Sequence, residues 1–188
     1  MAGNVDDKFV PTILPFLPPG VRFSPEKGDL IEFFLKKKIL GQPLPTDCVP
    51  TLEVYSINPD QLPLPTDAWR VRDEWYFFTT KPNTDSVIPT NDGYYSVITE
   101  DQIIKQEDED VGYMTTMAYF QGRPPKGKKS KWTIYEFRVK PDTIPATKHD
   151  DALKAKVSSF VAVNLFVKVK NRKGSTQGKT RMTEQSQK

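Results

Sequence analysis

The sequence predicts a mainly β protein of the α+β class, built on a twisted antiparallel sheet with one N-terminal helix. Three observations predict it. Runs with a period of two, rich in aromatic and β-branched residues, follow one another from residue 51 to residue 170. Most of the 17 prolines cluster between residues 11 and 67, which excludes long helices and central strands there. A single apolar stripe at helical spacing interrupts that proline-rich third.

The one helix that the sequence predicts spans residues 25–40. Ser24 is placed to cap its first turn, and Pro25 stands at the first helical position, where its missing N–H is not needed. Gly41 follows the last helical residue and is typical of a C-terminal stop. The residues that repeat at helical spacing and predict a buried face are Leu30, Phe33, Phe34 and Ile39.

Six strands are predicted after this helix, at residues 51–57, 74–80, 93–99, 113–120, 131–139 and 159–170. Short turns join most of them, which predicts antiparallel pairing in a strongly twisted sheet that is one-sided or barrel-like. The last run alternates most clearly, with Val161, Val163 and Leu165 on one side and Asn164 on the other. Residues 171–188 are polar and lack this alternation, which predicts a disordered basic tail.

Charge is distributed unevenly along a chain whose net charge is only +3. Residues 100–110 carry six acids and one base. Residues 123–131, RPPKGKKSK, carry five bases and no acid, and residues 168–188 carry seven bases and one acid. A DNA-facing surface gathers basic groups and keeps acidic ones away, so the two basic segments are candidates for phosphate contacts. On charge alone, a solvated surface loop explains residues 123–131 equally well.

Composition and motifs argue against several other classes of protein. No apolar run approaches the roughly 20 residues of a membrane helix, and the N-terminus lacks the basic-then-apolar order of a secretory signal. Cys48 is the one cysteine, which excludes an intrachain disulfide and predicts a reducing compartment. His149 and Cys48 lie in loops without a catalytic partner, and the acidic run lacks metal-ligand spacing. We therefore expect no enzyme, metal, cofactor, small-molecule substrate or membrane partner.

Five segments match one known family in order and spacing. They are LPPGVRFSPEKGDL (17–30), VPTLEVYSINPDQLP (49–63), EWYFF (74–78), GRPPKGKKSKWTIYEFRV (122–139) and SFVAVNLFVKVK (159–170). Together they resemble the plant NAC domain, a transcription-factor domain. The resemblance implies a twisted antiparallel sheet packed between the N-terminal helix and short helical elements. It also implies double-stranded DNA with a CGTG-type core as a partner, and a location in the nucleus.

The resemblance places a dimer interface in the N-terminal segment, at Leu17, Pro18, Gly20, Arg22 and Asp29. In the family, an Arg and an acidic residue at the last two positions pair across the dimer. Arg22 and Asp29 are therefore expected to pair in a homodimer, or in a heterodimer with another family member. Asp29 replaces the usual Glu, which keeps the charge but shortens its reach. Without the resemblance, these two residues are ordinary surface charges near a helix start.

The family's DNA-reading strand, GYWKATGKD, is the part that this chain matches least. Its counterpart is GYYSVITED (93–101), where Tyr95 replaces Trp and Ser96 replaces Lys. Bulkier residues follow, and Glu100 brings an anion toward the phosphates. The DNA contacts that the resemblance implies are Tyr95 and Ser96 on this strand, with Lys126, Lys128, Lys129 and Lys131 as phosphate contacts.

We interpret the chain as a sequence-specific DNA-binding transcription regulator of the NAC type that acts as a dimer. Its predicted parts are an N-terminal tail (1–14), a dimerisation and helix segment (15–65), a sheet with DNA-facing loops (66–170) and the basic tail (171–188). Two alternatives stay open. One is a degenerate dimerisation module that binds DNA weakly or not at all and modulates family partners. The other binds nucleic acid without sequence preference through its basic segments.

Overall fold

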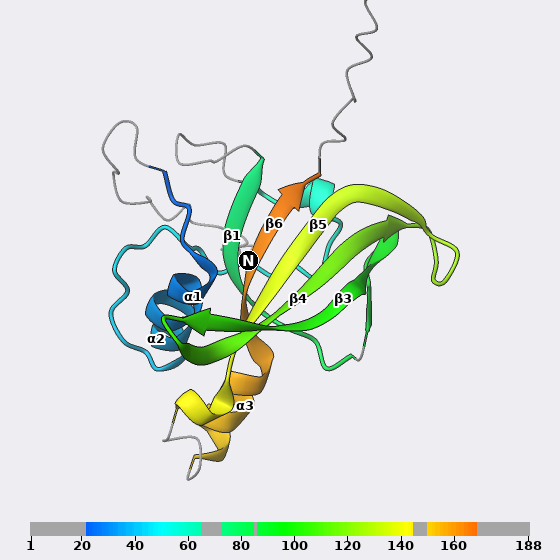
Figure 1. Ribbon diagram of the computed structural model, residues 1–188. Helices are drawn as coiled ribbons and strands as arrows, with labels where there is room; N and C mark the ends of the chain where they lie inside the picture. Colours follow the sequence, from blue (N-terminus) through cyan, green and yellow to red (C-terminus); the bar gives the residue numbers. More distant parts are fainter. Residues whose placement is uncertain (1–21, 65–72, 85, 145–149, 169–188) are drawn as a thin grey trace, which may run out of the picture.

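The computed structural model describes residues 22–64, 73–84, 86–144 and 150–168 (Figure 1). Its centre is a six-stranded antiparallel sheet in the order β1-β6-β5-β4-β3-β2, curved into a half-barrel. The strands are β1 (Glu74–Thr80), β2 (Val87–Pro89), β3 (Gly93–Gln106), β4 (Glu109–Gln121), β5 (Lys128–Val139) and β6 (Phe160–Val167). The predicted mainly β fold with antiparallel pairing is confirmed.

The strand predictions agree best with the structure at β1, which is an edge strand of the sheet. Residues 74–80 form β1 with the predicted bounds, and the strand predicted at residues 93–99 extends to Gln106 in β3. The sequence does not predict β2, because three residues that end in Pro89 carry almost no alternation. β2 pairs only with the start of β3, so the rest of β3 is an edge among the described residues.

The strand predicted at residues 51–57 is wrong. Thr51 forms an isolated parallel bridge with Phe78, and the chain then turns. Val54 and Tyr55 are both buried, although neighbouring side chains of a strand point to opposite faces. The segment is an irregular cover over the sheet, in which burial replaces ladder hydrogen bonds.

The predicted helix forms as three consecutive parts, α1 (Lys27–Asp29), a π-helical segment (Leu30–Leu35) and α2 (Lys36–Ile39). It begins after Glu26, so Ser24 does not cap it as predicted. The π-helical turns point four of their six residues inward but leave Phe33 43% exposed, so Phe33 is not part of the buried stripe. Gly41 ends the helix as predicted, with a φ of +67°.

The start of the helix lies directly against the far end of β3. A Cβ atom at Gly28 would clash with Oε1 of Gln106 and would lie 2.7 Å from the carbonyl oxygen of Lys105. This close approach explains a glycine inside a helix, where it costs about 1 kcal/mol relative to alanine. Next to it, Oδ1 of Asp29 accepts a hydrogen bond of 2.8 Å from Nε2 of Gln106.

The sheet is buried on both faces, and each face has its own apolar cluster. The helix packs on one face, where its residues meet Phe78, Met114, Phe137 and Ala162. The irregular segment covers the concave face, where its residues meet Phe77, Tyr95, Met117, Ile134, Val161, Val163 and Leu165. The predicted alternation along β6 is confirmed, since Val161, Val163 and Leu165 share the concave face while Ala162 lies on the other.

Short helical elements complete the layers beside the sheet. They are α3 (Asp151–Ser159) and the 3₁₀ turns at Pro59–Gln61 and Pro141–Thr143. Oδ1 of Asp150 caps α3 by accepting a 2.9 Å hydrogen bond from the backbone N–H of Leu153. The sequence does not predict α3, because Val157 is its one buried side chain and the apolar stripe is short. The predicted sheet between an N-terminal helix and short helical elements is confirmed.

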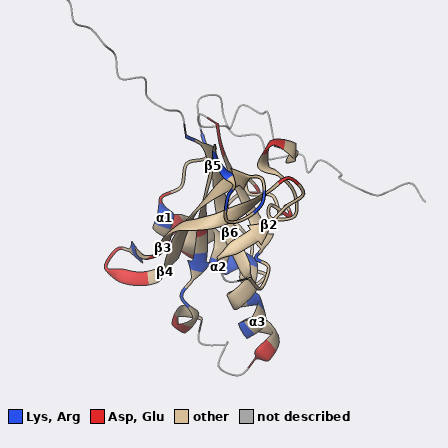
Figure 2. Ribbon diagram, turned by 90° about the vertical axis from the view of Figure 1, so that its right-hand side faces the viewer, with Lys and Arg blue, Asp and Glu red and all other residues tan. Residues whose placement is uncertain are grey.

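The acidic and basic segments lie at opposite ends of β4. The acidic tip, residues 107–110, joins β3 to β4 and is the red turn beside these strands in Figure 2. The basic loop, residues 123–131, lies at the other end; it connects β4 to β5, and from Lys128 onward its residues already form the start of β5. β4 has 13 residues, which at about 3.3 Å each separate its ends by roughly 40 Å. The fold therefore keeps the acidic tip far from the basic loop.

Candidate nucleic-acid interface

The basic loop is anchored at its base by an aromatic residue of β3. The ring of Tyr94 stacks on that of Phe120 with the centroids 5.2 Å apart. The hydroxyl of Tyr94 accepts a 3.2 Å hydrogen bond from the backbone N–H of Gly127. A Cβ atom at Gly127 would lie 2.6 Å from the same ring, so the loop approaches Tyr94 as closely as a glycine allows. The loop therefore has a defined position relative to β3.

The four predicted phosphate contacts of this loop, Lys126, Lys128, Lys129 and Lys131, are all exposed. Within the described part of the chain, none of their ammonium groups forms an ion pair or a side-chain hydrogen bond. The backbone N–H of Lys168 donates a 2.9 Å hydrogen bond to the carbonyl oxygen of Lys131. The last described residue, Lys168, thus lies beside the basic loop.

The structure separates the two residues predicted to contact DNA from β3. The side chain of Tyr95 is 0% exposed and packs edge-on against Tyr55 and Tyr119 in the concave-face cluster. Burial, followed by the charges of nearby groups, raises the pKa of Tyr95, so its phenol is neutral. The prediction that Tyr95 contacts DNA is therefore wrong, because alternation along β3 turns its ring into the core. Ser96 points the other way and is half-buried between β2 and β4.

A shallow hollow of about 400 Å³ lies beside β3, next to the residue that precedes the start of β2. Its lining residues are Lys81, Ser86, Val97, Glu100, Asp101, Thr115 and Arg138. Both cations in this set are paired with carboxylates of the same protomer. The hollow therefore offers little free positive charge, unlike the basic loop at the start of the same strand.

Lys81 belongs to a buried polar group. Its ammonium lies 2.8 Å from Oε1 of Glu136, whose side chain is 0% exposed, while Lys81 itself is 19% exposed. The hydroxyl of Tyr55 donates a 2.5 Å hydrogen bond to the other carboxylate oxygen. Burial, together with the charge of Glu136, raises the pKa of Tyr55 well above its ordinary value, so the phenol keeps its proton. Each oxygen of the buried carboxylate thus has a donor.

Arg138 forms the second pair at the edge of the hollow. One guanidinium nitrogen donates to Oδ2 of Asp101, and the hydroxyl of Thr115 donates a 2.6 Å hydrogen bond to Oδ1. Partial burial raises the pKa of Asp101, but these hydrogen bonds and the charge of Arg138 outweigh it, and the pKa lies below its ordinary value of 3.8. The guanidinium also lies 5.7 Å from the ring centroid of Tyr113. Arg138 is therefore held by two neighbours, the carboxylate of Asp101 and the ring of Tyr113.

A buried asparagine that the sequence analysis does not single out fixes the turn before β3. Oδ1 of Asn58 accepts hydrogen bonds from the hydroxyls of Thr90, at 2.7 Å, and Tyr119, at 2.8 Å. Its Nδ2 donates to Oδ2 of Asp92 at 2.8 Å. Asn58 is 3% exposed, so these bonds tie the irregular segment to the turn between β2 and β3. No sequence signal marks it, because the network joins residues 32 to 61 positions apart.

The predicted dimer residues are only partly described. Leu17, Pro18 and Gly20 lie outside the described residues. Arg22 is exposed, and Asp29 is half-buried with one oxygen bound to Gln106 of its own protomer. The second oxygen of Asp29 has no hydrogen bond or ion pair with another described residue, so it keeps an acceptor site.

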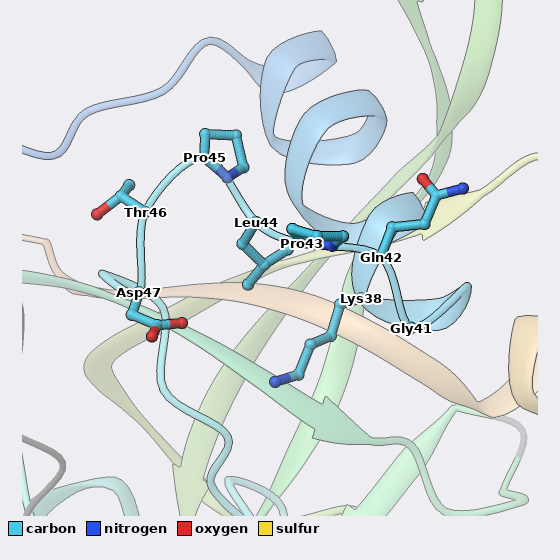
Figure 3. A pocket seen from close by; sticks show the side chains of 8 residues that line it. All are labelled: Lys38, Gly41, Gln42, Pro43, Leu44, Pro45, Thr46 and Asp47. Carbon is cyan, nitrogen blue, oxygen red and sulfur yellow. The ribbon is translucent and has the colours of Figure 1, made fainter.

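The other features of the chain contribute no residue to the candidate DNA-contact surface. A second hollow, lined by Lys38, Asp47 and the loop between them, lies at the end of α2 and contains none of the predicted contact residues (Figure 3). His149 lies outside the described residues, and Cys48 is half-buried near the hydroxyl of Thr46 at 3.0 Å. Within the described chain, no three His, Cys, Asp or Glu side chains are grouped to hold a metal ion. Every helix described is too short or too polar to cross a membrane.

Comparisons with known proteins agree on one family. The family model described as "No apical meristem (NAM) protein" matches residues 18–139. The chain is 31% identical to NAC transcription factor 29 of Arabidopsis thaliana over 147 residues, which cover 73% of this chain and 53% of that protein. It is 30% identical to NAC domain-containing protein 41 of the same plant over 157 residues, 81% of this chain and 54% of that protein. A third relative is NAC domain-containing protein 2 of Solanum lycopersicum, 30% identical over 73% of this chain and 51% of that protein. The chain spans about half the length of these relatives.

Proposed function

Because the chain belongs to the NAM family of NAC-domain proteins, we propose that it is a DNA-binding transcription regulator that acts as a dimer in the nucleus. The observation that carries the proposal is the basic loop. Its four exposed lysines have no partner among the described residues, and its base is held by Tyr94. The acidic tip lies at the other end of β4, so it does not repel DNA that approaches the loop.

The lysines of the basic loop contact phosphates, while β3 supplies the contacts to base edges. A lysine cluster binds phosphates, which are the same in every sequence, so it positions the duplex but does not distinguish one DNA sequence from another. Ser96 is the contact proposed for the strand, since its hydroxyl donates to or accepts from a base edge. Tyr95 supports β3 from the core and is not part of the contact set.

The dimer forms through the N-terminal segment, with Arg22 of one protomer paired to Asp29 of the other. Gln106 holds one oxygen of Asp29 and orients the carboxylate, while the other oxygen accepts from the partner. An exposed pair of this kind is worth about 0–1 kcal/mol, so apolar burial supplies most of the stability of the dimer. The proposal covers both a homodimer of this chain and a heterodimer with another family member.

Fluorescence anisotropy on two duplexes at several salt concentrations tests the proposal. One duplex carries a CGTG core and the other a shuffled sequence. We expect at least a tenfold preference for the core, which corresponds to about 1.4 kcal/mol. Replacing Lys126, Lys128, Lys129 and Lys131 together by Gln is expected to lower the log–log salt slope by up to about 3.6, because each phosphate contact contributes about 0.9.

A control variant replaces three half-buried lysines of α2, Lys36, Lys37 and Lys38, by Gln, because α2 lies on the other side of the molecule from the connection between β4 and β5 (Figure 1). This variant is expected to bind as the unchanged protein does. Equal binding to both duplexes would remove sequence reading and leave a binder without preference. Absence of binding to either duplex at low salt would refute direct DNA recognition by this chain alone and favour a dimerising modulator.

A further inference from the structure

Lys81 lies beside β3, the strand to which the proposed function assigns contacts with base edges. It lines the hollow beside β3, between the end of β1 and the start of β2. Its backbone N–H donates a 2.7 Å hydrogen bond to the carbonyl oxygen of Ser159, which fixes the main chain at this point. The direction of the side chain therefore decides whether its charge faces the solvent or the protein.

The side chain of Lys81 is directed to the protein side. Its ammonium is 2.8 Å from Oε1 of Glu136, a carboxylate on the central strand β5 that is completely buried. The remaining oxygen of this carboxylate is occupied by Tyr55, whose neutral phenol satisfies a hydrogen bond but not a charge. Lys81 is thus the one described cation in contact with Glu136. Moving the ammonium out to a ligand would leave a buried anion without a counter-charge, which is strongly unfavourable.

We propose that Glu136 sequesters Lys81, so that this cation is withheld from nucleic-acid phosphates and the hollow beside β3 adds no free positive charge to that of the basic loop. The inference deepens the proposed function, on which its DNA-binding test rests. Glu136 acts as a positioning residue, because it occupies the site on Lys81 that a phosphate oxygen would take. Arg138 is held in the same way by Asp101 on the other side of the hollow. Both cations of the hollow are therefore matched by protein carboxylates rather than by ligand.

Replacing Glu136 by Gln removes the buried charge and keeps the shape and an acceptor for Tyr55. The proposal predicts that E136Q binds DNA more tightly than the unchanged protein, because Lys81 becomes free to neutralise one more phosphate. The log–log salt slope is expected to rise by about 0.9, which at roughly 0.1 M salt is about an eightfold gain in affinity. A gain that appears equally on core and shuffled duplexes is expected, since phosphate contacts are independent of sequence.

The double variant K81Q/E136Q identifies the source of that gain. It removes both charges of the pair, so it is expected to bind DNA with the affinity and salt slope of the unchanged protein. E136Q without any gain would overturn the proposal, and so would a gain that persists in K81Q/E136Q. K128Q provides the reference slope for losing one free lysine of the basic loop.

A second measurement on the unchanged protein does not require DNA. Acylation of lysine amines, followed by mass spectrometry, reports how accessible each ammonium is. We expect Lys81 to react several-fold more slowly than Lys126, Lys128 and Lys129, and E136Q to abolish this protection. Equal reactivity in the unchanged protein would overturn the sequestration. If Lys81 is protected while neither duplex binds, the proposed DNA binding fails and the sequestration stands.

Discussion

The basic loop and the hollow beside β3 lie at the two ends of one stretch of β3, and both contain cations. In the loop, four lysines are exposed and have no partner among the described residues. In the hollow, Lys81 and Arg138 are each matched by a carboxylate of the same protomer. The difference shows that the number of cations near a surface does not equal the charge which that surface offers to a ligand. What matters is whether each cation is already paired with a carboxylate that the fold places beside it.

The largest expected effect that separates the two regions is on folding stability. Lys81→Met leaves the buried carboxylate of Glu136 without a counter-charge, and we expect a loss of about 3–5 kcal/mol in the free energy of unfolding. Lys128→Met is the matched control in the basic loop and is expected to change it by no more than about 0.5 kcal/mol. Urea denaturation followed by far-UV circular dichroism measures both.

The pair variant Lys81→Met with Glu136→Gln makes this comparison sharper. Because it removes the buried anion together with its partner, we expect most of the lost stability to return. A loss of unfolding free energy below about 1 kcal/mol for Lys81→Met, or equal losses for Lys81→Met and Lys128→Met, would contradict the contrast between a paired and an unpaired lysine.

A smaller effect is expected for the second pair of the hollow. Asp101 is 48% exposed, so its interaction with Arg138 is weakened by solvent, unlike that of the buried Glu136. Asp101→Asn is expected to lower the free energy of unfolding by about 0–1 kcal/mol at neutral pH. A loss as large as that of Lys81→Met would show that exposure does not distinguish the two pairs. Chemical denaturation under the same conditions makes the comparison.

The smallest effect is the pH dependence of this second pair. Because the pKa of Asp101 is lowered in the folded protein, its ionised form stabilises the fold at pH values above its ordinary pKa of 3.8. That contribution is lost as the pH falls below 3.8 and through the folded-state pKa. The difference in stability between the unchanged protein and Asp101→Asn is therefore expected to shrink on acidification. Denaturation curves at pH 7, 5 and 3 check this, and a difference that grows toward pH 3 would contradict it.

Local sequence patterns predict the elements whose structure depends mainly on the preferences of their own residues. β1 has the predicted bounds because its aromatic and β-branched residues alternate along a complete strand. The helix ends at Gly41 as predicted, because a positive φ is a property of that one residue. Residues 51–57 carry the same composition but do not pair beyond Thr51, since the concave face of the sheet buries Val54 and Tyr55 together.

The candidate site divides in the same way. A run of lysines between prolines and glycines predicts an exposed basic loop. Its four lysines are exposed, but three of them stand on the first residues of β5. Tyr95 and Ser96 are neighbours in the aligned motif, but alternation along β3 sends the ring of Tyr95 into the core and the side chain of Ser96 to the opposite face of the sheet. The pairing of Lys81 with Glu136 joins residues 55 positions apart, so no local pattern indicates it.

By itself, the sequence determined the β class, the helix and its stop, the position of the basic loop and the resemblance to one family. These follow from periodicity, from backbone preferences of single residues and from motifs in order, all of which are readable along the chain. The tertiary structure alone decided which side chains face the core, which cations meet carboxylates, and that the two charged segments lie at opposite ends of β4. The physical reason is that burial and ion pairing depend on contacts between distant residues, which exist only once the sheet has assembled.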